Sequence, residues 1–147
     1  MYLCTKFMSH KSFSFFCALL SIMFVTSCKK DENPTPSVNI NFDIIVTNIE
    51  YKELWNDGGF VYVTGGVKGI IIYRRNEDEY LAIERNCTYK PQDSCAIAEV
   101  DASKQYMNCK CCASRFAWDT SVMKGPATIP LRQYGTKLDG NRLYVYN

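Results

Sequence analysis

The stretch that decides the fold runs from Cys87 to Phe116 and reads CTYKPQDSCAIAEVDASKQYMNCKCCASRF. Valine would fill a core better than cysteine does, so packing alone does not explain so many cysteines in so short a stretch. In an exported protein such a cluster indicates disulfides, metal ligation or both. The stretch holds five of them: Cys87, Cys95, Cys109, Cys111 and Cys112.

On both sides of this stretch the sequence predicts short β-strands. Apolar and polar residues alternate through residues 39–46, which is the period of a half-buried strand. Glycine-containing turn signals, such as Asp57-Gly58-Gly59 and Asp139-Gly140, separate the others. No helix is predicted after residue 38, so the pattern predicts an all-β sandwich or barrel. The further strands are expected at residues 60–64, 69–73, 80–83 and 142–146.

The first 27 residues predict an export signal. Lys6 and Lys11 precede an apolar stretch, residues 13–25, that is shorter than the roughly 20 residues of a membrane-spanning helix. It ends in Val25-Thr26-Ser27-Cys28, which resembles a bacterial lipobox. This resemblance implies that Cys28 is lipidated, becomes the new N-terminus and tethers the protein to a membrane. An ordinary secretory signal or an N-terminal anchor is the alternative.

Residues 28–37 are polar, contain two prolines and predict a linker. Its start, residues 29–32, looks like the acidic tag of some surface lipoproteins, although a solvated linker explains it as well. We therefore expect an outer-membrane lipoprotein of the bacterial cell envelope, facing the periplasm or the cell surface. The remaining residues, 38–147, have the length of one domain. Without the signal the chain carries 15 basic and 15 acidic residues, which gives no reason to expect nucleic-acid binding.

The cysteine pattern resembles the Rieske [2Fe–2S] family. That family has a Cys-Thr-His start in its first loop and Cys-Pro-Cys-His-Gly-Ser, often followed by Arg-Phe, in its second. This chain reads Cys87-Thr88-Tyr89 with Cys95 following, and later residues 109–116, CKCCASRF. Residues 125–134 are similar to the family's third loop and its exit. The resemblance implies an antiparallel β sandwich with a small cluster-binding-type β subdomain, here from about Asn86 to Ala117.

Carried over residue by residue, the resemblance implies a role for each site residue. Cys87 and Cys109 match the two cysteines that hold one iron, and Ser114 matches a hydroxyl that donates to a bridging sulfide. Cys95 and Cys111 match a pair that forms a disulfide in many members. Tyr89 and Cys112 stand where the two histidine ligands of the other iron are expected. Since the only histidine is His10, inside the signal, the ordinary two-cysteine, two-histidine cluster is excluded.

Three interpretations of the remaining thiols, Cys87, Cys109 and Cys112, stay open. They could ligate an atypical [2Fe–2S] cluster or a metal such as zinc, with Tyr89 or Asp93 as the fourth ligand. Cys87 and Cys109 could instead form a second disulfide that replaces the cluster. Cys112 could also be a reactive thiol, with a pKa lowered by the neighbouring Lys110 and Arg115.

The function that we expect from the sequence is that of a non-catalytic, disulfide-stapled binding or structural module, without a bound cofactor and with an unknown protein partner. The alternative is an electron-transfer protein that binds an altered cluster or other metal through Cys87, Cys109, Cys112 and Tyr89. An enzyme is not expected, because the chain has no room for the separate iron domain of the family's oxygenases and no serine–histidine pair.

Overall fold

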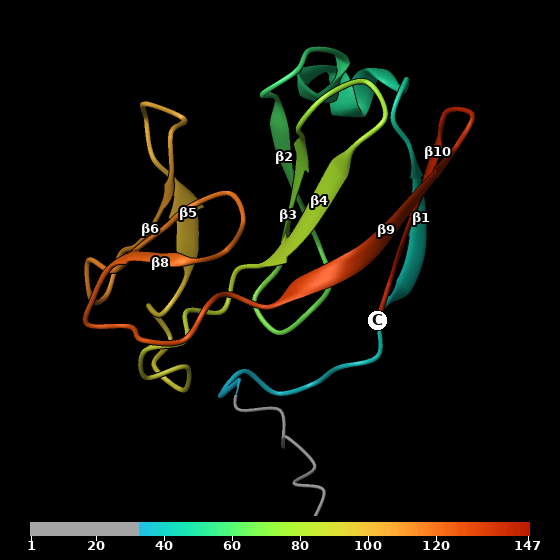
Figure 1. Cartoon of the computed structure of the whole chain (residues 1–147). Helices are drawn as coiled ribbons and strands as arrows, with labels where there is room; N and C mark the ends of the chain where they lie inside the picture. Colours follow the sequence, from blue (N-terminus) through green and yellow to red (C-terminus); the bar gives the residue numbers. More distant parts are fainter. Residues whose placement is uncertain (1–32) are drawn as a thin grey trace, which may run out of the picture. The chain divides into compact units, whose positions relative to one another are not determined.

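The computed structural model describes residues 33–147, which form two antiparallel sheets and a single short helix (Figure 1). The first sheet has six strands in the order β1-β10-β9-β4-β3-β2, and the second has four in the order β5-β6-β7-β8. The all-β class predicted from the sequence is confirmed. The elements are β1 (Asn41–Ile45), η2 (Ile49–Trp55), β2 (Phe60–Val63), β3 (Ile70–Arg74), β4 (Tyr80–Glu84), β5 (Ala98–Val100), β6 (Met107–Cys109), β7 (Arg115–Phe116), β8 (Val122–Lys124), β9 (Gln133–Asp139) and β10 (Arg142–Tyr146).

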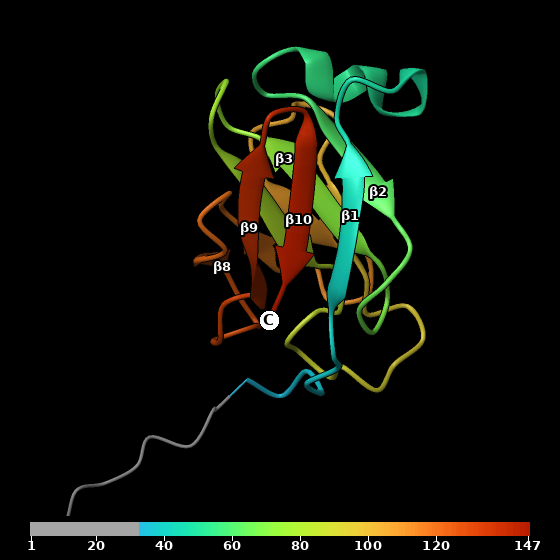
Figure 2. The ribbon, with the colours of Figure 1, turned by 90° about the vertical axis from the view of Figure 1, so that its right-hand side faces the viewer.

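The six-stranded sheet curls, so that β1, β10 and β9 face β2 and β3 across an apolar interior (Figure 2). We call this interior the barrel core. The inward side of β1 supplies Ile40, Ile44 and Val46, as the alternation in the sequence predicts. The other buried members are Leu54, Ile70, Ile72, Tyr80, Ala82, Tyr134, Leu143 and Val145.

A second apolar cluster, here called the interface core, joins the two sheets. Ile71, Leu81 and Ile83 project from the opposite face of β3 and β4, because successive side chains of a strand point to opposite faces. They meet Met107 and Phe116 of the four-stranded sheet. Two buried cysteines, Cys87 and Cys109, also belong to this cluster, so the cysteine-rich part is rooted in the core.

Two local predictions need correction. Residues 49–55 form the 3-10 helix η2, where no helix was expected, and its apolar Leu54 is buried in the barrel core. The cysteine-rich subdomain also extends beyond Ala117, since β8 closes its sheet at Lys124. Both elements are too short to show a helix or strand period in the sequence.

The predicted signal peptide and Cys28 lie outside the described residues. Residues 33–37, predicted as the end of a linker, pack against the domain: Thr35 is buried, and Arg132 Nη2 donates to its carbonyl at 3.1 Å. The Thr35 hydroxyl in turn donates to the carbonyl of Asn86 at 3.5 Å. The chain thus enters the domain beside the residue that precedes Cys87. Within residues 33–147, no helix is long and apolar enough to cross a membrane.

Candidate metal centre

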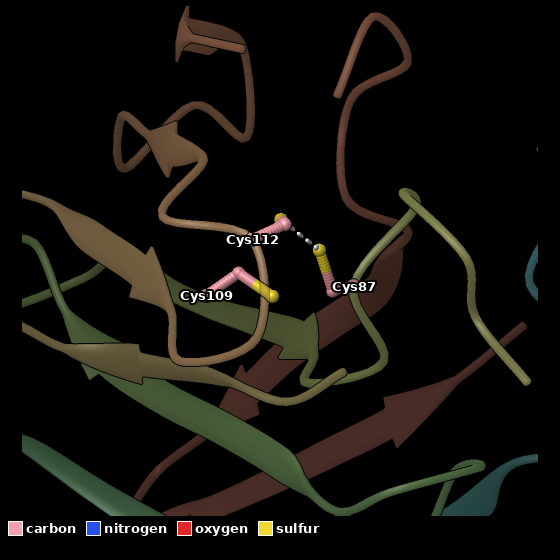
Figure 3. A group of neighbouring side chains, drawn as sticks. All are labelled: Cys87, Cys109 and Cys112. Carbon is pink, nitrogen blue, oxygen red and sulfur yellow. Dashed lines mark hydrogen bonds between the residues drawn. The ribbon is translucent and has the colours of Figure 1, made fainter. Parts of the chain in front are cut away.

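Three cysteine side chains converge on one point from two loops (Figure 3). Cys87 follows β4, Cys109 ends β6, and Cys112 lies in the turn that leads to β7. Their sulfur atoms all lie within 4.8 Å of one another, and the Sγ atoms of Cys87 and Cys112 are 3.7 Å apart. Main-chain bonds fix both loops, because the Cys87 N–H donates to Ala96 O and the Cys109 N–H donates to Ser114 O, each at 2.9 Å. We refer to these three residues as the thiol triad.

The turn between Cys109 and Ser114 brings Cys112 back over Cys109. Ala113 adopts a φ of 58°, and its N–H donates to the Cys109 carbonyl at 2.9 Å. The Rieske motif quoted above has glycine at this position, the residue that adopts a positive φ without steric cost. Here Ala113 adopts this strained conformation, so the turn from Cys109 to Ser114 forms without a glycine.

The triad combines two buried thiols with one that is partly exposed. Burial, and then the hydrogen bond to Cys109, raise the pKa of Cys87 far above its ordinary value. Burial also raises the pKa of Cys112, but contacts with the Ser114 hydroxyl and N–H and with the other two thiols outweigh this, so that its pKa is lowered overall. Cys112 therefore becomes a thiolate more readily than Cys87 does.

Lys110 and Arg115 are not what lowers the pKa of Cys112. Lys110 Nζ pairs with a Glu99 carboxylate oxygen at 2.8 Å, and the Arg115 guanidinium lies 4.8 Å from the centre of the Tyr106 ring. The sequence prediction that these two cations activate Cys112 is therefore replaced by the contacts with Ser114 and the other thiols.

Ser114 links the triad to the third loop. Its side chain is fully buried. Its Oγ accepts a hydrogen bond from the Ala127 N–H at 2.9 Å and another from the Cys112 thiol at 3.1 Å. A second link joins the first and third loops, since the Thr88 hydroxyl donates to Ile129 O at 2.6 Å. Ser114 thus faces a sulfur ligand, in the place that the resemblance to the Rieske motif gave to a hydroxyl near the cluster.

One disulfide joins the two cysteine loops, and the triad remains outside it. Cys95 and Cys111 are bonded, with their Cα atoms 5.3 Å apart, which is the pairing that the resemblance implies. Cys87, Cys109 and Cys112 are free. The second disulfide that was considered between Cys87 and Cys109 is therefore absent from this structure.

The first loop is also held by a lysine that sequence reasoning missed. Lys68, between β2 and β3, inserts its ammonium group among three main-chain carbonyls of residues 91–96. It donates to Pro91 O at 3.0 Å, to Ala96 O at 3.3 Å and to Asp93 O. A lysine in a glycine-rich turn is normally expected to be solvated, so no sequence signal distinguishes Lys68 from an ordinary surface residue.

Glu84, at the end of β4, is the second residue that the sequence does not reveal. Its carboxylate is fully buried and accepts the main-chain N–H groups of Val67, Lys68 and Asn86 and the hydroxyl of Tyr134, at 2.7 to 3.0 Å. This carboxylate joins the β2–β3 turn to the start of the first cysteine loop. In the sequence a charged residue after the apolar strand at residues 80–83 is expected at the end of that strand, exposed to solvent.

Of the two proposed fourth ligands, Asp93 does not join the triad. Among the cysteine, histidine, aspartate and glutamate side chains of residues 33–147, the group contains only the three cysteines. Tyr89 packs on the interface core, with Lys90 Nζ 5.6 Å from its ring centre, and its main-chain N–H bonds the Cys87 thiol.

Residues 45–135 match the family model described as the Rieske [2Fe-2S] domain. The chain belongs to the Rieske family. It is 25% identical over 83 residues to the cytochrome b6-f complex iron-sulfur subunit of Chlorobaculum thiosulfatiphilum, a match that covers 50% of this chain and 44% of that subunit. The solved plasma membrane Rieske protein PetC3 from Synechocystis PCC 6803 shares the fold, with a TM-score of 0.53 and 20% identity over 76% of this chain and all of that one.

The donor set of this Rieske domain does not fit the two-cysteine, two-histidine cluster. Cys112 and Tyr89 replace the two imidazoles, and residues 11–147 contain no histidine. Imidazole ligation of one iron is what separates a Rieske centre, in potential and in proton coupling, from an all-thiolate cluster. The triad can nevertheless bind metal, because thiolates at this spacing are effective ligands.

Proposed function

We propose that this Rieske domain is a non-catalytic, lipid-anchored module of the bacterial cell envelope that holds a metal centre on Cys87, Cys109 and Cys112. The observation that carries the proposal is the convergence of three free thiols within 4.8 Å where the two cysteine loops meet the interface core. The names of the two relatives agree with a metal centre in general but do not specify this one, since one is named an iron-sulfur subunit and the other a Rieske protein.

The membrane tether is a separate part of the proposal and rests on the lipobox-like sequence ahead of Cys28. The described chain contacts the domain from Asn33 on, where Asn33 Nδ2 donates to Pro130 O at 3.2 Å, so only residues 29–32 separate Cys28 from it in the sequence. Cys28→Ser is expected to abolish incorporation of labelled palmitate and to release the protein from the membrane fraction. Continued membrane association without label would support an uncleaved N-terminal anchor instead.

The metal centre is tested on the full chain, extracted anaerobically in detergent from cells that assemble iron–sulfur clusters. Iron, zinc, copper and acid-labile sulfide are measured per chain, together with the visible spectrum. We expect near-stoichiometric metal in the wild type and its loss in the triple variant Cys87→Ala/Cys109→Ala/Cys112→Ala. The matched control, Lys110→Met, changes an exposed residue of the second cysteine loop and should retain the metal.

A second candidate is the metal-free, disulfide-stapled binding module. One observation favours it: the Lys68 ammonium group and the Cys95–Cys111 disulfide hold the first loop in place without a metal. A wild-type chain without metal under these conditions, and with three titratable thiols in the triad, would establish this candidate in place of the metal centre.

A further inference from the structure

The spacing of the three sulfur atoms bears on how many metal ions they hold. A tetrahedral ion with metal–sulfur bonds of about 2.3 Å places its sulfur ligands about 3.8 Å apart. The Sγ atoms of Cys87 and Cys112 are 3.7 Å apart, and no pair in the triad exceeds 4.8 Å. The sulfurs of Cys87 and Cys112 thus have the separation of two ligands of one ion, and the Cys109 sulfur lies within 4.8 Å of both.

A two-iron cluster makes a different demand on its ligands. Ligands on different irons lie farther apart than ligands on the same iron, because the separation of the two metals is added. In the Rieske motif, Cys87 stands on the first iron, whereas Cys112 replaces a ligand of the second. Here the sulfurs of Cys87 and Cys112 are 3.7 Å apart, which is the separation of ligands on the same ion and not of ligands on two irons.

The number and type of donors also favour a single ion. A two-iron cluster needs four protein ligands, whereas among the cysteine, histidine, aspartate and glutamate side chains of the described residues only three, all of them sulfur, are grouped here. Such a soft donor set selects thiophilic cations over magnesium, calcium or manganese. Lys110 and Arg115, the cations next to Cys112 in the chain, are engaged by Glu99 and Tyr106, so a bound cation would supply the positive charge that buried thiolates require.

The open side of the triad is at Cys112. Cys87 and Cys109 are buried, whereas Cys112 is partly exposed and is held by the buried Ser114 hydroxyl. A fourth, exchangeable ligand from solvent can therefore approach an ion on the side of Cys112. Three protein ligands with one open position is the arrangement of zinc sites that bind an exogenous ligand.

We propose that Cys87, Cys109 and Cys112 bind a single thiophilic cation, Zn²⁺ or Cu⁺, whose fourth position opens to solvent beside Cys112. This inference rests on the proposed function and specifies its metal. Binding releases the thiol protons of the ligating cysteines to solvent, and no electron is transferred.

The test uses the full chain in detergent, stripped of metal under reducing, anaerobic conditions and titrated with Co²⁺ as a spectroscopic probe. Tetrahedral cobalt–thiolate coordination gives intense visible ligand-field bands, and we expect these to saturate at one Co²⁺ per chain. Titration of the Co²⁺ form with Zn²⁺ and with Cu⁺ then shows which ion displaces the probe. X-ray absorption of the chain loaded with the displacing ion should give a sulfur shell near ~2.3 Å and no metal–metal shell.

Variants separate ligation from folding. Cys112→Ala should abolish the cobalt bands, and Ser114→Ala, which removes the hydroxyl that contacts Cys112 and accepts the Ala127 N–H, should weaken binding about 10- to 100-fold. The Lys110→Met control should bind as the wild type does, because the ion pair of Lys110 with Glu99 lies outside the triad. Far-UV circular dichroism of metal-free Cys112→Ala must match that of the metal-free wild type, which shows that the loss of binding is not a loss of fold.

Two contrary outcomes are distinguishable. Two irons and two sulfides per chain, with a metal–metal shell, would overturn the single-ion inference and leave the metal-binding function standing as an altered-cluster electron carrier. Absence of any metal in the extracted chain, together with no response to Co²⁺, Zn²⁺ or Cu⁺, would overturn both.

Discussion

At the scale of single residues, the buried carboxylate of Glu84 sets the geometry ahead of the first cysteine loop. It accepts four hydrogen bonds, one of them from the Tyr134 hydroxyl at 2.7 Å. Hydrogen bonds to charged groups contribute about 1.5–3 kcal/mol each. We expect Tyr134→Phe, which removes one of the four, to lower the free energy of unfolding at pH 7 by about that amount in chemical denaturation.

The same pair predicts a pH dependence. Burial, then the hydrogen bond to Glu84 and its charge, raise the pKa of Tyr134 above its ordinary 10.0. The folded protein therefore keeps the phenol proton at a pH where the unfolded chain loses it, so this contribution is complete below about pH 10 and falls as the pH rises further. The difference in stability between wild type and Tyr134→Phe should shrink above pH 10, by up to about 1.4 kcal/mol per pH unit. A difference that stays constant from pH 8 to 11 would contradict this linkage.

Gly66 is confined by the same carboxylate. A Cβ at this position would lie 2.1 Å from a Glu84 oxygen, whereas one at Gly140 would meet nothing within 4 Å. Their φ angles are nearly equal, 63° and 62°, so alanine pays the same backbone cost of roughly 1–2 kcal/mol at both. We expect Gly66→Ala to be less stable than Gly140→Ala by a further ~1–3 kcal/mol, measured by urea denaturation. Equal losses would mean that Glu84 can move aside without cost.

At the scale of elements, Lys68 connects the β2–β3 turn to the first cysteine loop. Lys68→Met keeps the aliphatic stem but removes the ammonium group that donates to the carbonyls of Pro91, Asp93 and Ala96. We expect a loss of about 1–3 kcal/mol and faster hydrogen exchange at the amides of Asp93 and Ala96, which bond within the loop.

Lys110→Met is the matched control for Lys68→Met. Lys110 lies on the second cysteine loop, but its ion pair with Glu99 is exposed, so its loss should cost no more than about 1 kcal/mol. Unchanged loop exchange in Lys68→Met would show that the disulfide alone orders the loop.

Elements with a clear side-chain period were predictable from the sequence, and short ones were not. The strand expected at residues 142–146 matches β10, and the burial of Ile40 and Ile44 follows the alternation around β1. In contrast, β5 to β8 have two or three residues each and were not resolved as strands within the cysteine-rich stretch. Their pairing depends on distant partners, which a local pattern does not encode.

The candidate site shows the same division. The triad cysteines and Ser114 stand out because their residue types are unusual and their spacing follows a family motif. Lys68 and Glu84 do not stand out, because a charged residue is normally solvated and nothing local marks these two as held by the main chain. The contact between Cys87 and Cys112 likewise required coordinates, since it depends on the positive φ of Ala113.

At the scale of the whole molecule, the two apolar cores share β3 and β4. Ile70 and Ile72 face the barrel core, and Ile71 between them faces the interface core. The cysteine-rich subdomain also contacts β3 through Trp118, whose ring stacks on Tyr73 with centroids 3.8 Å apart. Because the same strands form one wall of each core, loss of one core removes a wall of the other. The domain should therefore unfold as a single cooperative unit.

A chain that carries Trp55→Phe tests this cooperativity, because it leaves Trp118 as the sole tryptophan. Its fluorescence reports the docking of the subdomain on β3, while far-UV circular dichroism reports the sheets, and we expect coincident urea transitions. In this background Ile71→Ala, at a fully buried position, should lower the free energy of unfolding by about 2–5 kcal/mol and move the midpoints of both probes together. Ile49→Ala, at a position 73% exposed, should change the free energy of unfolding measured by either probe by no more than ~0.5 kcal/mol. A fluorescence transition that precedes the loss of sheet would mean instead that the subdomain undocks first, and that the loops bearing the triad open while the barrel remains folded.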